Sequence, residues 1–306
     1  MFLPLRRPLA WLLAGAAVLL AACGGGTSQI QAFKPPRLTA FGDDASSFTP
    51  EGRKYAVNEF GSDGQTLDCN ALPIWIQDVA RAFNFGFAQC PLTGAETKAL
   101  TRAQPGARVA DVVRQVDAHV AAGGFQNEEL VLVLAGTWDV IDLYAQFPGR
   151  SRDELINEAR ARGARLAEQV NRMVGLGARV VVATMPDIGL SPYGLAQGTE
   201  GAKLLTDLSA ALNGRIRATI INDGRLIGLV LTDEFVQTAA RAPGFFGLNN
   251  AKDAVCTAAL PDCSTKTLVG GATAGLYLWA NDRTFGTGGH RQLGLLAVAR
   301  ATLNPF

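Results

Sequence analysis

Three aspartates stand where they could carry chemistry. Asp44 follows the apolar run 38–41, Asp139 follows the run 130–135, and Asp282 lies in a late segment that we place at the same edge of a predicted sheet. The carboxyl ends of parallel strands meet at one edge, where ligand sites lie. Three carboxylates converging there would bind a hard cation such as Ca²⁺ through oxygen ligands. We favour the alternative, in which the three aspartates are solvated or hydrogen-bonded separately and neither a metal nor another cofactor is bound.

A carboxylate nucleophile would also need a general base, and the chain has two histidines. An aspartate that attacks saturated carbon forms an ester, which a histidine-activated water then cleaves. His119 falls inside a predicted helix, away from any strand end, which indicates a surface or partly packed side chain. His290 begins the last predicted helix and would need a loop rearrangement to approach Asp44. Ser46 and Ser47 are alternative nucleophiles, but they would lack the same base.

Four cysteines follow residue 23. In an exported chain an even number of cysteines suggests disulfides, and four allow three connectivities. We expect each cysteine to pair with its neighbour in sequence, Cys69 with Cys90 and Cys256 with Cys263. A metal site is the alternative, but no histidine accompanies the cysteines and no Cys-x-x-Cys spacing is present.

Apolar runs alternate with helical patterns along the chain. The runs 38–41, 130–135, 178–183 and 227–231 are short and mostly β-branched, which is typical of strands buried on both faces. Apolar residues at helical spacing predict helices over 109–122, 152–176, 204–220 and 292–303. This alternation predicts a parallel sheet covered by helices on both sides.

The N-terminal segment reads as a targeting signal. Arg6 and Arg7 precede the apolar run 9–20, which is too short for a comfortable membrane span and ends in Leu-Ala-Ala-Cys23. This pattern resembles a bacterial lipoprotein signal, in which cleavage precedes a cysteine that is then acylated; a plain signal peptide with a chance cysteine is the alternative. Several acyl chains on Cys23 would anchor the protein stably to a membrane. Because Gly24 and not an aspartate follows, the resemblance implies the outer membrane.

The predicted organisation is therefore a signal peptide over residues 1–22, a lipidated cysteine and tether over residues 23–36, and one α/β domain over residues 37–306. The chain carries 28 basic and 27 acidic residues, a formal net charge of +1, and no basic block. Nucleic acid is therefore not expected as a partner.

Five segments, in order and at family-like spacing, resemble the SGNH or GDSL esterases and lipases. They cover residues 37 to about 295 and read AFGDDASSF, VLVLAGTWDVIDLY, RVVVATMPDIGLSP, APGFFGLNNAKDAVC and LYLWANDRTFGTGGHRQLG. The resemblance implies a flavodoxin-like three-layer α/β/α sandwich around a roughly five-stranded parallel sheet.

The residues that carry the family's chemistry are changed in this chain. The family's hydrolysis uses a serine, a histidine and an orienting acid. The resemblance places Asp44 at the serine, Thr284 at the histidine, and Asn281 at the acid with Asp282 beside it. Family-type ester hydrolysis is therefore expected to be lost.

The family's oxyanion hole is changed as well. It uses a backbone amide, a glycine and an asparagine. The asparagine position holds Trp138, and either Gly94 or Gly106 is the glycine. We expect Trp138 to plug the former oxyanion pocket; a stacking platform for a sugar is the alternative.

Asp43 is the family's structural aspartate, which we interpret as a buried hydrogen-bond acceptor. Asp44 is expected to cap the helix that follows the first strand and to fill the oxyanion site with its own charge. The predicted ligand cleft comprises Gly42, Asp43, Asp44, Gly136, Trp138, Asp139 and Asp282.

The leading hypothesis is an exported lipoprotein on the periplasmic or surface face of the bacterial outer membrane. It would have the SGNH/GDSL hydrolase fold and a degenerate catalytic site, and it would bind acylated envelope glycans or lipids as a pseudoenzyme. An active esterase or lipase is the second hypothesis. A structural envelope protein is the third.

Overall fold

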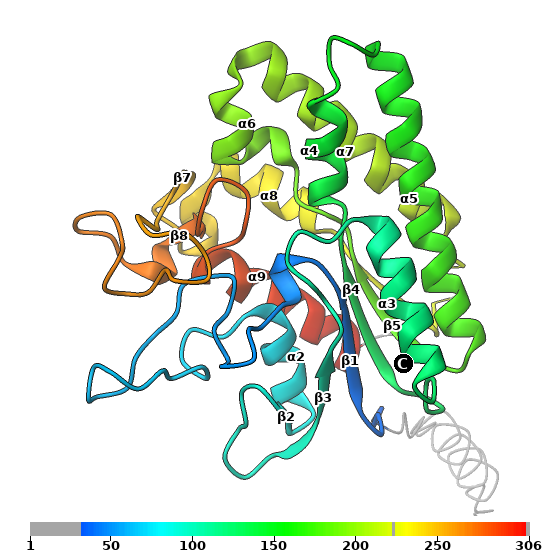
Figure 1. Ribbon diagram of the computed structural model, residues 1–306, viewed down its shortest axis with the longest axis vertical. Coiled ribbons are helices and arrows are strands. Elements are labelled where there is room, and N and C mark those ends of the chain that lie inside the picture. The colour runs from blue at the N-terminus through cyan, green and yellow to red at the C-terminus, as the bar shows by residue number, and fades with distance from the viewer. Residues whose placement is uncertain (1–31, 222–223, 304–306) are drawn as a thin grey trace, which may run out of the picture. The chain divides into compact units, whose positions relative to one another are not determined.

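A six-stranded, entirely parallel sheet lies at the centre of the computed structural model, which describes residues 32–221 and 224–303 (Figure 1). The strand order is β2-β3-β1-β4-β5-β6. The strands are β1 (Leu38–Gly42), β2 (Phe85–Phe87), β3 (Glu96–Thr101), β4 (Leu130–Leu134), β5 (Arg179–Ala183) and β6 (Ile227–Val230). The four predicted apolar runs are all strands. Two further strands, β2 and β3, make the sheet wider than the expected five.

Helices cover both faces of the sheet and bury a separate core on each side. On one face lie α3 (Val109–Ala121), α4 (Thr137–Tyr144), α5 (Arg152–Gly175) and α7 (Gly198–Thr219). On the other face lie α2 (Trp75–Ala82), α8 (Thr232–Arg241) and α9 (Thr287–Thr302). Successive residues of a strand point to opposite faces, so Leu132 packs in one core and Val133 in the other. The predicted three-layer α/β/α sandwich is confirmed.

The remaining elements lie near the carboxyl ends of the strands or in long connections. They are α6 (Pro192–Ala196), β7 (Asn250–Ala254), β8 (Tyr277–Trp279) and the short 3-10 turns η1 (Asp44–Ser46), η2 (Ile188–Leu190), η3 (Pro243–Phe246) and η4 (Ala274–Leu276). Strands β7 and β8 form a separate two-stranded sheet. A small third core, which includes Val57 and Val255, packs beneath these connections.

Both predicted disulfides are present. Cys69 pairs with Cys90, and Cys256 pairs with Cys263. The first joins the connection between β1 and α2, which contains Cys69, to the residues just after β2, which contain Cys90. The second lies in the connection between β7 and β8.

The compact unit that carries the sheet begins at Phe33, a few residues before β1. Within the described ranges, no helix is long and apolar enough to cross a membrane. The predicted signal peptide and Cys23 lie outside the described residues.

Candidate functional site

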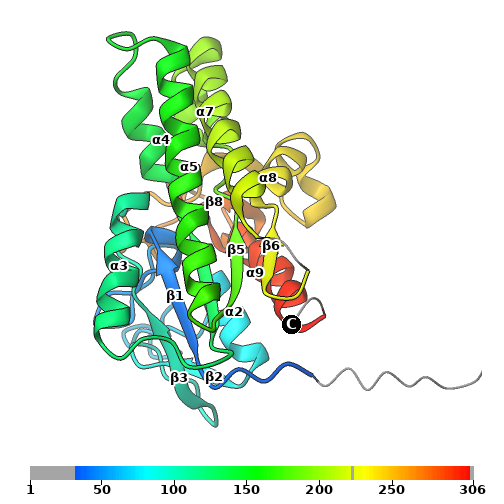
Figure 2. The ribbon, with the colours of Figure 1, turned by 90° about the vertical axis from the view of Figure 1, so that its right-hand side faces the viewer.

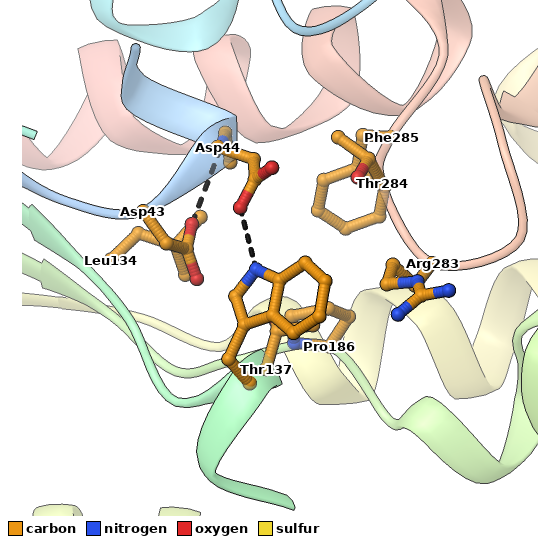
Figure 3. A pocket seen from close by; sticks show the side chains of 10 residues that line it. Asp43, Asp44, Leu134, Thr137, Pro186, Arg283, Thr284 and Phe285 are labelled. Carbon is orange, nitrogen blue, oxygen red and sulfur yellow. Dashed lines mark hydrogen bonds between the residues drawn. The ribbon is translucent and has the colours of Figure 1, made fainter. Parts of the chain in front are cut away.

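A pocket opens at the carboxyl edge of the sheet, between the ends of β1 and β4 and the loop before α9 (Figure 3). Its cavity volume is about 10 Å³. That is room for about one water. The lining residues are Asp43, Asp44, Ala45, Leu134, Thr137, Trp138, Pro186, Arg283, Thr284 and Phe285.

Gly42 explains how β1 can turn so sharply into the pocket. Its φ is +137°, and a Cβ there would lie 1.9 Å from the carbonyl oxygen of Leu134 on the neighbouring strand. The position therefore requires glycine. The Gln115 side chain on α3 clamps this glycine from both sides, because its amide oxygen accepts from the Gly42 N–H at 2.9 Å and its amide nitrogen donates to the Gly42 carbonyl at 2.9 Å.

The Asp44 carboxylate is held by two hydrogen-bond donors. Its Oδ2 accepts from the Gly106 backbone N–H at 2.8 Å. The same oxygen accepts from the Trp138 indole Nε1–H at 2.6 Å (Figure 3). In the resemblance described above, the glycine and asparagine positions supply the donors that stabilise an oxyanion. Here a glycine and a tryptophan supply donors, and the protein's own carboxylate occupies them.

The structure distinguishes the two glycines that the sequence left open. Gly106 donates its N–H to the Asp44 carboxylate. Gly94 is exposed and lies in the connection between β2 and β3. Gly106 is therefore the one of the two glycines that contacts the Asp44 carboxylate.

Asp43, and not Asp44, caps the short turn η1, which corrects the expected role of Asp44. The Asp43 Oδ1 accepts from the Ala45 N–H at 3.2 Å, and the side chain is 3% exposed. Burial, and secondly the negative charge of Asp44, raise the pKa of Asp43 well above its usual value. Its Oδ2 is buried without a hydrogen-bond partner among the described residues.

Trp138 lies in the first turn of α4 and carries two guanidinium groups over its ring. The Cζ of Arg283 lies 4.8 Å from the ring centroid, and that of Arg108 lies 6.0 Å away. Arg283 also lies over Tyr193 at 5.2 Å. A sugar stacking on Trp138 would therefore compete with these arginines.

Thr284 lines the same pocket as Asp44. Asn281 does not point toward it as an orienting acid would. The Asn281 Oδ1 instead accepts from the backbone N–H groups of Arg283 and Thr284, at 3.0 and 2.7 Å. This side chain therefore shapes the loop.

Neither histidine lines the pocket. His290 is fully buried, its Nε2 has no partner among the described residues, and burial lowers its pKa to about 3. His119 is 2% exposed and packs against Phe41 and Phe125. The expected surface or partly packed His119 is thus a core residue, and burial lowers its pKa.

The two serines after Asp44 are also occupied. The Ser46 Oγ accepts from the indole Nε1–H of Trp75 at 3.1 Å, and the Ser47 Oγ donates to the Asp43 carbonyl at 2.8 Å. Both residues are fully buried. Neither is placed to attack a ligand in the pocket.

Of the predicted cleft residues, Asp43, Asp44 and Trp138 line this pocket, whereas Gly42, Gly136, Asp139 and Asp282 do not. The Asp139 carboxylate accepts from the Val109 N–H at 2.8 Å and pairs with Arg162 at 3.2 Å. Asp282 pairs with Arg283 at 2.5 Å. Among the residues that the structure describes, no three histidine, cysteine or acidic side chains gather to hold a metal ion. The three aspartates therefore bond separately.

Sequence reasoning missed Arg283, Thr137 and Pro186 as pocket residues. Pro186 stood in a quoted motif, and Arg283 stood between two residues already singled out. The signal for Arg283 was the neighbouring Asp282, since a carboxylate adjacent in sequence can hold a guanidinium in place. The structure has this pairing, with Arg283 Nε donating to Asp282 Oδ1 at 2.7 Å.

Comparison with known proteins gives structural likenesses. No protein-family model matches the chain, and no curated protein sequence matches it. A member of the lipolytic protein G-D-S-L family from Veillonella parvula superposes with a TM-score of 0.45 and 9% identity, over 86% of this chain and 97% of that one. The acetylxylan esterase Axe2 from Geobacillus stearothermophilus superposes with a TM-score of 0.46 and 14% identity, over 88% of this chain and 95% of that one. The acetyl xylan esterase AlAXEase superposes with a TM-score of 0.45 and 12% identity, over 85% of this chain and 96% of that one. These likenesses concern the fold alone.

Proposed function

We propose that this protein is a non-hydrolytic member of the SGNH/GDSL esterase fold, in which the former reaction centre is a small binding pocket. The observation that carries this proposal is the position of the Asp44 carboxylate on the N–H groups of Gly106 and Trp138. These donors are already satisfied by a negative charge. An anionic tetrahedral intermediate would have to displace that charge or lie beside it, and both are unfavourable.

The chemistry of the remaining pocket residues supports the same proposal. Attack of the Asp44 carboxylate on an ester would give a mixed anhydride, whose collapse regenerates the starting ester. No histidine lines the pocket to activate a water molecule. Thr284 carries a neutral hydroxyl, which is too weak a base to take a proton from a nucleophile or a water molecule.

We further propose that the protein acts at the outer membrane, anchored through acylated Cys23, and that its ligands are envelope glycans or lipids. The support is the sequence pattern of residues 1–23, with two arginines, an apolar run and small residues before the cysteine. A structural role in the envelope, which would use only the outer surface of the sandwich, is the outcome if no ligand binds.

Ester hydrolysis is the direct test. The protein starting at Gly24 is assayed on short and medium p-nitrophenyl esters, with Asp44→Ala alongside. We expect both proteins to match the buffer blank. Turnover by the natural chain that disappears in Asp44→Ala would instead establish the active esterase.

A rebuilt nucleophile and base are the positive control for that assay. The double variant Asp44→Ser, Thr284→His places a nucleophile and a base at the positions that the resemblance assigns and leaves the hydrogen bonds of Asn281 unchanged. The Gly106 and Trp138 donors are then free to stabilise an oxyanion. We expect turnover at least about 10²-fold above Asp44→Ser alone, because a positioned general base contributes that much.

A further inference from the structure

The pocket carries a negative charge that no cation of the protein pairs with. Within the described residues, Asp44 makes no ion pair. Arg283, which lines the pocket, is held by both carboxylate oxygens of Asp282 at 2.7 and 2.5 Å. Arg108, which lies over Trp138, is held by Asp142 in the same two-pronged way. Each nearby guanidinium hydrogen-bonds to its own aspartate and makes no ion pair with Asp44, although the charge of Asp44 adds to that of Asp282 in raising the pKa of Arg283.

The pocket also offers hydrogen-bond acceptors with unused capacity. The Asp44 Oδ2 takes both donors, so its Oδ1 accepts no hydrogen bond from a described residue. Thr284 lines the same pocket, and its hydroxyl makes no hydrogen bond with a described residue. At the floor, Asp43 is 3% exposed and its buried Oδ2 is unpartnered. A buried polar atom without a partner is uncommon in proteins and calls for an explanation.

We propose that the pocket binds a primary ammonium group carried by a larger ligand. An ammonium has three N–H donors and no acceptor, which matches a pocket that presents three acceptors, on Asp43, Asp44 and Thr284. Its charge complements Asp44. The inference rests on the proposed function, since it names the ligand chemistry of the same non-hydrolytic site.

The size of the pocket limits which part of the ligand enters. The space is sufficient for about one water-sized group. An ammonium head fits that space, whereas a whole sugar ring or an acyl chain does not. The body of the ligand would then lie outside the pocket. The charge of Asp44 reverses the preference of an oxyanion hole, which attracts electron-rich oxygen.

The test uses the indole resonance of Trp138, whose N–H donates to Asp44. Protein starting at Gly24, which contains the compact unit from Phe33, is labelled with ¹⁵N-tryptophan. Trp138→Phe identifies the resonance. Methylammonium, methanol and acetate are titrated at equal ionic strength. We expect a saturable shift of the Trp138 indole resonance with methylammonium and none with methanol or acetate, while Trp75 and Trp279 do not respond.

Two variants distinguish the effect of the Asp44 charge on methylammonium binding from the effect of the net charge of the protein. Asp44→Asn keeps the shape of the side chain and removes its charge, so it is expected to weaken methylammonium binding by at least about tenfold, the loss typical of a charge-assisted hydrogen bond. Asp153→Asn changes the net charge equally at an exposed site and is expected to leave binding within about twofold. An equal response to methanol, a preference for acetate, or unchanged binding by Asp44→Asn would overturn the inference.

The outcome is separable from that of the ester assay. Turnover would overturn the proposed function whatever methylammonium does, whereas absent turnover with absent methylammonium binding overturns this inference alone. Glucosamine and ethanolamine then distinguish the two sources of an ammonium group. Tighter binding of glucosamine assigns an amino sugar, and tighter binding of ethanolamine assigns a lipid headgroup.

Discussion

His290 shows how a single buried side chain sets the acid stability of the fold. It is fully buried at the start of α9, where burial, and secondly the charge of Lys54, lower its pKa to about 3. An unfolded chain would titrate this histidine near its usual pKa of about 6.5. Between these two values the unfolded state binds more protons, so the free energy of unfolding rises with pH and is lost as the pH falls toward 3.

We predict that the free energy of unfolding depends less steeply on pH in His290→Gln than in the natural chain. The natural chain should lose on the order of 1 kcal/mol of unfolding free energy per pH unit through this histidine as the pH falls from about 6.5. Urea denaturation at pH 5.0, 5.5, 6.0 and 6.5 measures the slope in both proteins. The comparison removes the contribution of carboxylates, because they titrate equally in both. Identical slopes would show that His290 is charged in the folded protein.

The sequence predicted which residues lie at the site only where a recognisable motif contained them. Asp44, Trp138 and Thr284 follow from the order of the segments, and the structure brings all three to one pocket. The choice of Gly106 over Gly94 was not predictable, because it depends on a hydrogen bond between residues 62 positions apart. The cap at Asp43 was assigned to Asp44, since two adjacent aspartates look alike in sequence.

At the scale of elements, the two disulfides are expected to contribute unequally. A disulfide stabilises mainly by limiting the unfolded chain, and more so for a longer loop. The sequence separation is 21 residues for Cys69–Cys90 and 7 for Cys256–Cys263. We expect the Cys69→Ser, Cys90→Ser pair to cost roughly 3 kcal/mol and the Cys256→Ser, Cys263→Ser pair roughly 2 kcal/mol.

Urea unfolding of the two double variants measures this difference, and their far-ultraviolet circular dichroism is the control for an intact fold. A larger loss from the Cys256 and Cys263 pair would contradict the prediction. It would mean that packing of the small third core, to which Cys263 contributes, outweighs the effect on the unfolded chain.

Element boundaries were predictable where apolar spacing is regular. The predicted helix 152–176 agrees with α5 to one residue at its end, and Ser151 with Glu154 forms its capping box.

Helix α9 begins at Thr287, five residues before the predicted start. Its first turn contains Gly288 and Gly289, which are poor helix formers in sequence. They are needed because a Cβ at either would lie 2.6 Å from a backbone oxygen of β8. Strands β2 and β3 lacked an apolar run and were missed.

At the scale of the whole molecule, the pocket and the start of the compact unit lie at opposite edges of the sheet. The chain enters β1 at the amino edge, where Figure 2 shows the start of the strand, and the pocket lies at the carboxyl edge. Three large apolar side chains at helix ends are also exposed, Leu176 by 45%, Ile221 by 61% and Leu303 by 82%. Each follows the last turn of a helix, α5, α7 or α9.

These features predict the orientation of an acylated protein on a membrane. The ten residues from Cys23 to Phe33 span at most about 35 Å, so acylation of Cys23 would keep the amino edge near the lipid. The pocket would then face the aqueous side, so its ligand would arrive from solution rather than from the anchoring leaflet.

Fluorescence quenching in nanodiscs measures this orientation in full-length, acylated protein. A fluorophore is attached at Leu303→Cys, and in a matched variant at Glu200→Cys, which is exposed at the start of α7. Lipids carrying a quencher should reduce the emission of the first label and leave the second unchanged. Mass spectrometry of Cys23 establishes acylation in both samples. With acylation present, stronger quenching at position 200 would mean that the pocket edge faces the membrane, and the ligand would then have to be a component of the lipid surface itself.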